Sequence, residues 1–234
     1  MQNLPLQICR WQPFTTASQL EQAAVEKILS LAKQAIAARG AFHIVLAGGT
    51  TPRRVYEALR QANTNWQAWH IYFGDERCLP AQHAERNSLM ASLAWLDHVG
   101  IPEQQIHPIP AELGAAKATE NYSLIINELH EFDLVLLGLG EDGHTASLFP
   151  GHELGTMENA PDTLAVFDAP KPPPERVSLS AHRLSNARQV IFLVTGKSKL
   201  QAVNDWRAGS AIPAAAITPK AGVDIYIEND LIQS

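Results

Sequence analysis

Hydrophobic and polar positions along this chain form blocks whose period changes from helical to extended. The first block places apolar residues on one helical face and predicts a helix; these residues are Leu20, Ala24, Ile28, Leu31 and Ala35. Two capping pairs suit its start, Thr16–Gln19 and Ser18–Glu21. Gly40 is placed to end the helix.

The following blocks alternate between strand-like and helix-like patterns. The segment AFHIVLAGG at 41–49 is short, apolar and β-branched, and it predicts a buried parallel strand. Similar runs predict strands at 70–74, 132–137, 164–167, 176–179, 190–194 and 223–227. Helices are expected after the TTP at 50–52, over 87–95, over 112–129 and after Gly196. The alternation predicts an α/β fold with a mostly parallel sheet and helices on both faces.

One proline-rich segment raises the question of a domain boundary. APKPPPE at 169–175 has the composition of a stiff linker. Strands are predicted close on both sides of it, which favours a surface loop instead. The chain has 234 residues, enough to bury one substantial core, so we expect a single domain over 1–234.

Composition narrows the class of protein. Hydrophobic residues make up 46% and charged residues 18%, as in ordinary globular proteins, and the net charge of -6 disfavours nucleic acid as a partner. Cys9 and Cys78 match neither a disulfide framework nor a metal motif. The first residues lack a secretory pattern, and no apolar run approaches the ~20 residues that span a bilayer. We expect a cytoplasmic protein with no membrane partner.

The segment AGGTTP at 47–52 is the first candidate site. Gly48 and Gly49 end a predicted strand and let the backbone approach a ligand closely. With Thr51 as N-cap and Pro52 as first helical residue, the free N–H groups of the helix can bind a phosphate. The hydroxyls of Thr50 and Thr51 add donors. The Walker A lysine is absent, and a plain strand-to-helix turn explains the segment equally well.

A second candidate is FGDERCLP at 73–80. Its charged residues follow a predicted strand, and the carboxyl ends of strands face the ligand crevice in open parallel sheets. Arg77 is suited to stabilise a phosphate or an oxyanion, with Asp75 or Glu76 orienting it. The alternative is a solvated loop with an internal ion pair.

The third candidate, GLGEDG at 138–143, matches the spacing of a dinucleotide-binding motif. That motif opens a helix, whereas SLFPG at 147–151 stops any helix early. The nucleotide interpretation is therefore set aside. The run then becomes a glycine-rich turn that presents His144 as a general base, and Asp142 is the nearest carboxylate in sequence to steer its tautomer. Neither H-E-x-x-H nor G-x-S-x-G occurs.

A fourth candidate combines RVSLS at 176–180 with VTGKSK at 194–199. Lys197 and Lys199 lie at the start of a predicted helix, where a cation opposes the helix dipole. A bound anion would explain that placement. Arg176 is the first residue of a predicted strand. The pattern is explained equally well if Arg176 is an exposed residue with no role in binding.

Taken together, these runs resemble the 6-phosphogluconolactonase family. The resemblance rests on AGGTTPRRVYEAL, FGDERCLPAQHAERNS, FDLVLLGLGEDGHTASLFPG and RVSLSAHRLSNARQVIFLVTGKSK, in this order. The DGHTASLFPG run is the most specific of them. AGGTTP stands where SGGSTP is commoner, and IPAAAITP lacks a serine that often follows its proline and alanine.

The resemblance implies a Rossmann-like fold similar to that of glucosamine-6-phosphate deaminases. It implies hydrolysis of 6-phosphogluconolactone in the pentose phosphate pathway, with no metal or nucleotide cofactor. The catalytic histidine falls on His144 and the arginine of the D-E-R run on Arg77. The phosphate pocket falls on Gly48, Gly49, Thr50 and Lys197. We also place Thr51, Asp75 and Arg176 among the substrate-binding residues, and we expect a monomer or a weak homo-oligomer.

Two rival functions compete with lactone hydrolysis. A glucosamine-6-phosphate deaminase or isomerase shares the glycine loop and the D-G-H turn. Such enzymes carry a tyrosine where this chain has Arg77 and an acid shortly after the turn, whereas here the first acid is Glu153. A sugar-phosphate sensor domain shares the fold, but the N-terminal residues are too few and too weakly basic for the usual helix-turn-helix.

Overall fold

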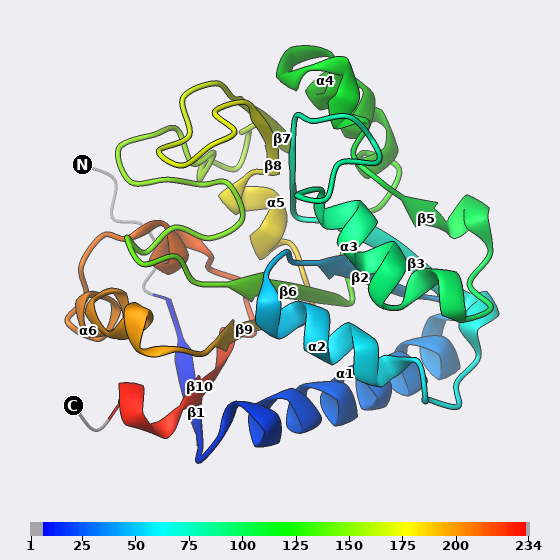
Figure 1. Ribbon diagram of the computed structural model, residues 1–234, viewed down its shortest axis with the longest axis horizontal. Coiled ribbons are helices and arrows are strands. Elements are labelled where there is room, and N and C mark those ends of the chain that lie inside the picture. The colour runs from blue at the N-terminus through cyan, green and yellow to red at the C-terminus, as the bar shows by residue number, and fades with distance from the viewer. Residues whose placement is uncertain (1–6, 233–234) are drawn as a thin grey trace.

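The computed structural model describes residues 7–232, and its centre is a seven-stranded parallel sheet (Figure 1). The strand order is β1-β10-β9-β6-β2-β3-β5, and every neighbouring pair is parallel. The strands are β1 (Cys9–Phe14), β2 (Phe42–Leu46), β3 (Trp69–Phe73), β5 (Ile106–His107), β6 (Leu134–Gly138), β9 (Val190–Val194) and β10 (Val223–Glu228). The predicted α/β class is confirmed.

Helices cover both faces of this sheet. They are α1 (Ala17–Arg39), α2 (Thr50–Leu59), α3 (Asn87–Ala94), α4 (Ala115–Ile126), α5 (Ala181–Ser185) and α6 (Leu200–Arg207). Figure 1 shows α1 and α2 below the sheet and α5 above it. One hydrophobic cluster runs from Leu20 on α1 to Leu231 near the end of the described chain. Within residues 7–232, no helix combines the length and apolar character of a membrane-spanning segment.

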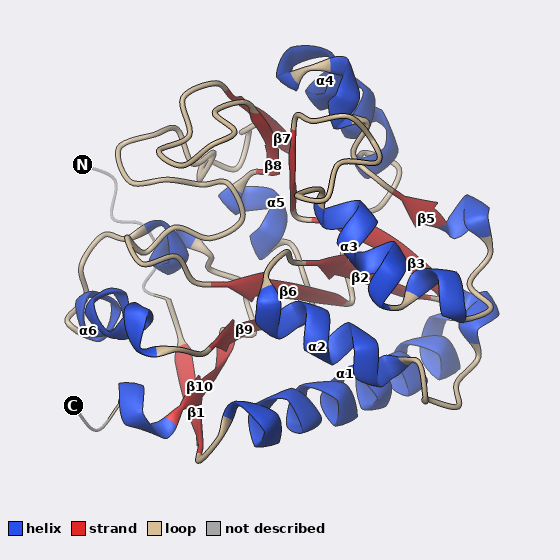
Figure 2. Ribbon diagram, viewed as in Figure 1, coloured by secondary structure: helices blue, strands red, loops and turns tan. Residues whose placement is uncertain are grey.

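A second, smaller sheet corrects one prediction. Two of the strands assigned to the parallel sheet, β7 (Thr163–Val166) and β8 (Arg176–Leu179), instead pair antiparallel with each other and with β4 (Asp75–Arg77) (Figure 2). The physical reason is the short connection at 167–175, because a parallel pair needs a crossover of a dozen or more residues, usually helical. The proline-rich segment is thus the loop of this antiparallel pair.

Local capping explains where α1 begins and ends. The Thr16 hydroxyl accepts a hydrogen bond from the Gln19 N–H at 3.2 Å, which selects the first of the two predicted caps. Gly40 adopts φ +82° at the other end, a left-handed conformation that glycine enters without steric cost. Ala32 takes the buried position predicted for Leu31, and the rest of the predicted face is buried.

Two helices and one strand differ from the prediction. α2 starts at Thr50 with Gly49 as its N-cap, so Thr51 is not the cap and Pro52 is not the first residue. The helix predicted over 112–129 is α4, separated by Gly114 at φ +83° from a short turn at Ala111–Leu113. β1 was not predicted, because its sequence CRWQPF is neither an apolar run nor a regular alternation, and none of its residues is fully buried.

Candidate active site

A cavity of about 200 Å³ opens at the carboxyl edge of the parallel sheet. Segments that follow β2, β3 and β6 line it, together with residues from the small sheet and from the turn that precedes α6. Its polar lining residues include Asp75, Arg77, Asn87, Glu141, His144, Lys171, Arg176 and Lys199. Four of the predicted site residues, Asp75, Arg77, His144 and Arg176, therefore line the cavity together with Gly48 and Gly49. They meet there because parallel strands end at one edge of the sheet.

His144 and Asp142 form a hydrogen-bonded pair on the turn after β6. The ring Nδ1 of His144 lies 2.5 Å from Asp142 Oδ1, and the same oxygen accepts from the backbone N–H of His144 at 3.2 Å. Burial alone would raise the pKa of Asp142, but the hydrogen bond and the charge of His144 hold it below its usual value. An ionised carboxylate only accepts hydrogen bonds, so Nδ1 carries the proton and Nε2 is left to accept one.

Two glycines make room for this pair. A Cβ added to Gly140 would lie 2.0 Å from Nδ1 of His144, so the ring occupies space that only glycine leaves free. Gly143 has φ +82°, and Ile212 stands against the place of its Cβ. The Gly143 carbonyl accepts from the Ala214 N–H at 3.1 Å. The IPAAA segment at 212–216 therefore supports the turn through its backbone and a methyl contact.

The nucleotide interpretation of the same run finds no structural support. Residues 139–162, all of them described, contain no helix between β6 and β7. The glycines instead serve close packing within the turn. Ala146, which lines the cavity, adopts φ +49°, an uncommon conformation for a residue with a Cβ that often occurs at functional sites.

Asp75 and Glu76 are neighbours with different surroundings. Asp75 lines the cavity and accepts hydrogen bonds from Asn87 Nδ2 at 3.0 Å and Ser147 Oγ at 2.6 Å. Glu76 is fully buried and accepts from the backbone N–H groups of Asn87 and Ser88, both at 2.8 Å. Glu76 thus caps the N-terminus of α3, a position where a carboxylate is favoured. Of the two carboxylates, Asp75 is the one that lines the cavity.

Asn87 ties this carboxylate to the glycine loop. A Cβ on Gly48 would lie 2.0 Å from Asn87 Oδ1, so the loop and the amide fit together only with glycine at this position. Gly48 and Gly49 both line the cavity. The predicted Thr50 starts α2, and the Thr51 hydroxyl lies 2.6 Å from that of Thr195, so it joins two loops rather than pointing freely into the site.

Arg77 and Arg176 lie opposite each other on β4 and β8. Arg77 donates from Nη1 to the Glu85 carbonyl at 2.6 Å, while its buried Nε has no partner among the described residues. Arg176 stands 5.5 Å from the ring centre of Phe149, which in turn contacts the His144 ring at 4.8 Å. Burial lowers the pKa of Arg176, and the charge of Asp75 opposes that effect.

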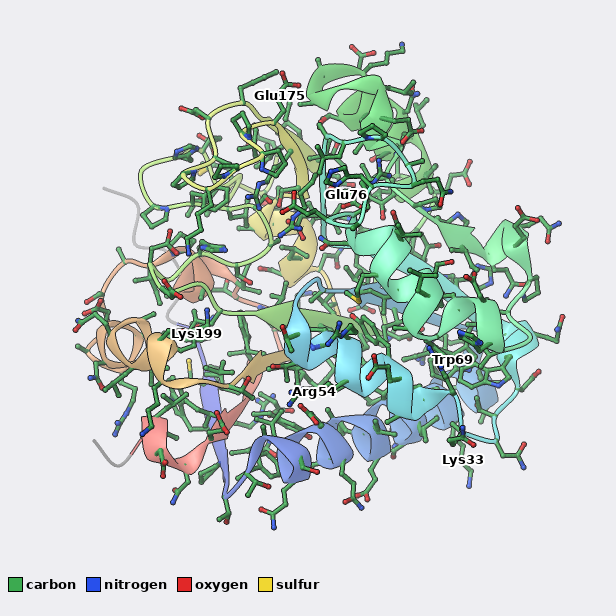
Figure 3. The ribbon with its side chains drawn as sticks, in the orientation of Figure 1. Lys33, Arg54, Trp69, Glu76, Glu175 and Lys199 are labelled. Atoms are coloured by element: carbon green, nitrogen blue, oxygen red, sulfur yellow. The ribbon has the colours of Figure 1, made fainter. Side chains whose placement is uncertain are left out.

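The two lysines of the GKSK run differ in position. Lys197, to which the resemblance assigns the phosphate, is exposed and does not line the cavity. Lys199 lines it, and burial lowers the pKa of its ammonium group. A 3₁₀ turn over Lys197–Lys199 precedes α6, which shifts the helix start beyond the predicted one. Figure 3 shows Lys199 at the beginning of α6 and Glu76 on β4, on separate elements around the site.

Sequence reasoning missed Asn87, Ser147 and Lys171 as neighbours of the site. Asn87 and Ser147 meet Asp75 across long sequence separations and carry no local motif. Lys171 lies in the proline-rich segment, whose composition indicates only a loop. Lys199 had a signal, its place in the GKSK run, but sequence spacing alone did not separate it from Lys197.

Comparisons with known proteins give one consistent result. The family model described as glucosamine-6-phosphate isomerases/6-phosphogluconolactonase matches residues 15–226. A 6-phosphogluconolactonase of Synechocystis sp. is 40% identical over 191 residues, which cover 77% of each chain.

Solved structures agree with this match. The structure of 6-phosphogluconolactonase from Trypanosoma brucei has a TM-score of 0.87 at 27% identity and covers 97% of this chain and 98% of that chain. A monomeric glucosamine-6-phosphate deaminase has a TM-score of 0.80 at 20% identity, with 96% of this chain and 99% of that chain covered. The latter likeness shows a shared fold.

Proposed function

Because the chain belongs to the glucosamine-6-phosphate isomerase/6-phosphogluconolactonase family, we propose that it hydrolyses 6-phosphogluconolactone to 6-phosphogluconate. One observation carries the proposal: the His144–Asp142 pair lies at a cavity that Arg77, Arg176 and Lys199 also line. A general base can activate water to attack the ester bond of the lactone, and the cations beside it can bind the phosphate that the lactone carries.

His144 acts as the general base in this proposal. Its Nε2 takes a proton from water as the water oxygen attacks C1 of the lactone, and the imidazolium then protonates the ring oxygen as the C1–O bond breaks. Asp142 holds the ring in the required tautomer and stabilises the imidazolium. Arg77, whose Nε has no partner among the described residues, stabilises the negative charge that develops on the carbonyl oxygen.

The phosphate is assigned to the other side of the cavity. The backbone of Gly48 and Gly49 and the first N–H groups of α2 are free to donate to an anion. Lys199, rather than Lys197, supplies the cation. Asp75 helps to shape the site through Asn87, and Arg176 adds positive potential. Binding the phosphate away from the reacting bond fixes the lactone beside His144.

Three further parts of the proposal concern the setting of the protein. We place the reaction in the cytoplasm, where the free thiols of Cys9 and Cys78 suit a reducing compartment. We assign the reaction to one domain over the whole chain. The protein acts on its small-molecule substrate as a monomer or a weak homo-oligomer.

The test is an assay of 6-phosphogluconolactone hydrolysis, with product formation coupled to a dehydrogenase and the buffer rate subtracted. The purified protein is expected to accelerate hydrolysis well above that rate. Glucosamine 6-phosphate is supplied in a parallel assay that detects ammonia. Ammonia release without lactone hydrolysis would replace the proposal by deamination, and tight phosphosugar binding with neither activity would favour a sensor domain.

A further inference from the structure

Phe149 is a buried aromatic residue that the proposed mechanism does not use. It is 1% exposed, yet it lies outside the main hydrophobic cluster and belongs to a small one with Val166 and Ala169. The neighbouring Leu148 packs into the main cluster. Two aliphatic side chains, one of them a single methyl group, cover only part of a phenyl ring, so other groups must cover the rest.

Two of these other groups line the active-site cavity. The centre of the Phe149 ring lies 4.8 Å from that of the His144 ring, and the planes of the two rings are inclined by 48°. The guanidinium carbon of Arg176 lies 5.5 Å from the centre of the same phenyl ring. His144 and Arg176 line the cavity, whereas Phe149 does not. The phenyl ring therefore supports both side chains from behind.

Hydrogen bonds hold the backbone on each side of Phe149. Ser147 Oγ donates to Oδ2 of Asp75 at 2.6 Å, and the Phe149 carbonyl accepts from the His152 N–H at 3.2 Å. A buried phenyl ring on a fixed backbone is confined to one rotamer by its neighbours. Its contacts with the two cavity side chains are therefore defined by the fold.

A general base needs its accepting nitrogen in a fixed position. The hydrogen bond with Asp142 fixes Nδ1 of His144, but a single hydrogen bond lets the imidazole ring tilt about the bonded atom. The contact with Phe149 adds a second restraint, at the ring itself. Together the two restraints set the direction of Nε2. A displacement of about 1 Å at the reacting atoms costs roughly a hundredfold in rate.

The same phenyl ring stabilises the position of Arg176. A guanidinium within about 6 Å of an aromatic ring centre is attracted by the ring, most strongly where water is excluded. Arg176 is 5% exposed, and it also donates to the carbonyls of Lys171 at 2.8 Å and Pro173 at 3.1 Å. One phenyl ring thus fixes the proposed base and a cation of the cavity relative to each other.

Resting on the proposed function, we propose that Phe149 is a positioning residue for lactone hydrolysis. Its ring sets the tilt of the His144 imidazole and holds Arg176 at the cavity, without touching the substrate. Loss of the ring should therefore slow the chemical step more than it weakens substrate binding.

The test is Phe149→Leu, which keeps a buried apolar side chain and removes the flat ring. Two controls separate positioning from packing. Val166→Ala removes apolar volume from the same small cluster. Phe42→Leu makes the same substitution at a fully buried phenylalanine that packs against Trp69 at the amino end of β2. Thermal unfolding shows that each variant is folded, and Phe149→Met, which fills more of the space, is used if Phe149→Leu does not fold.

For Phe149→Leu, kcat for 6-phosphogluconolactone is expected to fall about ten- to a hundredfold, with KM within about threefold of the wild type. Both controls should keep kcat within about twofold, because they lose packing but no contact with the base. A wild-type kcat in Phe149→Leu, or an equal fall in Val166→Ala, overturns the proposal. A higher KM with an unchanged kcat also overturns it, because the ring would then serve binding.

The tautomer of His144 is a second readout, and it needs no substrate. Heteronuclear NMR in alkaline solution, where ordinary imidazoles are neutral, locates the ring proton, and His144→Gln identifies the signal. The wild type should carry the proton on Nδ1, where Asp142 accepts it. In Phe149→Leu the tilted ring loses this partner, so part of the signal should move to the Nε2–H form. Val166→Ala should keep the wild-type signal.

The two readouts distinguish failure of this inference from failure of the proposed function. If no lactone is hydrolysed but the tautomer changes in Phe149→Leu and not in Val166→Ala, the positioning role stands and the reaction is reassigned. If the lactone is hydrolysed but kcat and the tautomer are the same in these two variants, the role of Phe149 is rejected.

Discussion

Histidines occur at both ends of the parallel sheet, and their surroundings differ. At the carboxyl edge, the side chain of His144 is 21% exposed and has a carboxylate 2.5 Å from its Nδ1. Near the amino ends of β2 and β3, His43 and His70 stack at 4.6 Å, and His107 on β5 stacks with Tyr72 at 4.6 Å. Burial lowers the pKa values of all three of these histidines.

The difference shows what makes a histidine useful as a base. His144 has a partner that stabilises its protonated form, and it opens on a cavity where water can reach it. In the cluster of His43, His70 and His107, burial lowers the pKa of each ring, and the charge of His70 lowers the pKa values of His43 and His107 further. Residue type alone therefore says little about function; the partner of each ring decides it.

Replacing His144 removes the proposed general base and has the largest expected effect on turnover. His144→Ala should reduce kcat by roughly two to four orders of magnitude, because a general base contributes about that much. The measurement is steady-state hydrolysis of 6-phosphogluconolactone with the buffer rate subtracted. His70→Ala, at the other end of the sheet, is the control and should leave kcat nearly unchanged. Wild-type turnover in a folded His144→Ala variant would falsify the general-base role.

Filling the space beneath the ring has the next largest effect. Gly140→Ala places a Cβ where Nδ1 of His144 lies, at 2.0 Å, so the ring must move. A displacement of about 1 Å from the reacting position costs roughly a hundredfold in rate. The comparison is with Gly138→Ala, where the added Cβ meets nothing within 4 Å. Equal activity of the two variants would show that the ring position is unimportant.

Removing the charge of the partner carboxylate tests the contribution of the hydrogen bond between Asp142 and His144. Asp142→Asn removes a hydrogen bond to a charged group, worth about 1.5–3 kcal/mol, so kcat should fall by roughly one to two orders of magnitude. Steady-state hydrolysis of 6-phosphogluconolactone measures this loss, and thermal unfolding shows that the variant is folded. A kcat equal to that of the wild type would remove Asp142 from the proposed mechanism.

The cluster at the amino ends predicts a smaller, separate effect on stability. Burial, followed by the charge of His70, lowers the pKa of His43 from 6.5 to about 4. Below pH 6.5 the unfolded chain therefore binds a proton that the folded chain excludes, and the free energy of unfolding falls as the pH drops toward 4. With a discount for partial exposure, His43 contributes roughly 1–2 kcal/mol of this loss.

Urea unfolding at a series of pH values measures that slope. His43→Gln should flatten it between pH 6.5 and 4. The groups around His43 are His70, Tyr72, His107, Arg39 and Asp133. The Tyr72 hydroxyl lies 3.3 Å from His43 Nδ1, and the Asp133 carboxylate accepts from the His43 N–H at 2.8 Å. An unchanged slope in His43→Gln would mean that these neighbours, not His43, govern the acid sensitivity.

Short segments of the sequence are enough to predict much of the fold and part of the site. The apolar runs identify β2, β6, β9 and β10, because a strand buried on both faces needs continuous hydrophobic residues. The DGH turn identifies His144 for a similar reason: its glycines, its carboxylate and its ring are all close in sequence, so their contacts follow from local geometry. The family resemblance drew on the same local runs.

Contacts between distant segments were decided by tertiary structure alone. Glu76 became a helix cap and Asp75 a cavity residue, because the small sheet turns one inward to α3 and the other toward Ser147. The antiparallel pairing of β4 and β8 set Arg176 opposite Arg77. Lys199 rather than Lys197 lines the cavity, because a 3₁₀ turn delays α6. Periodicity reports which face of an element is buried; which distant side chains then meet depends on the packing of the whole molecule.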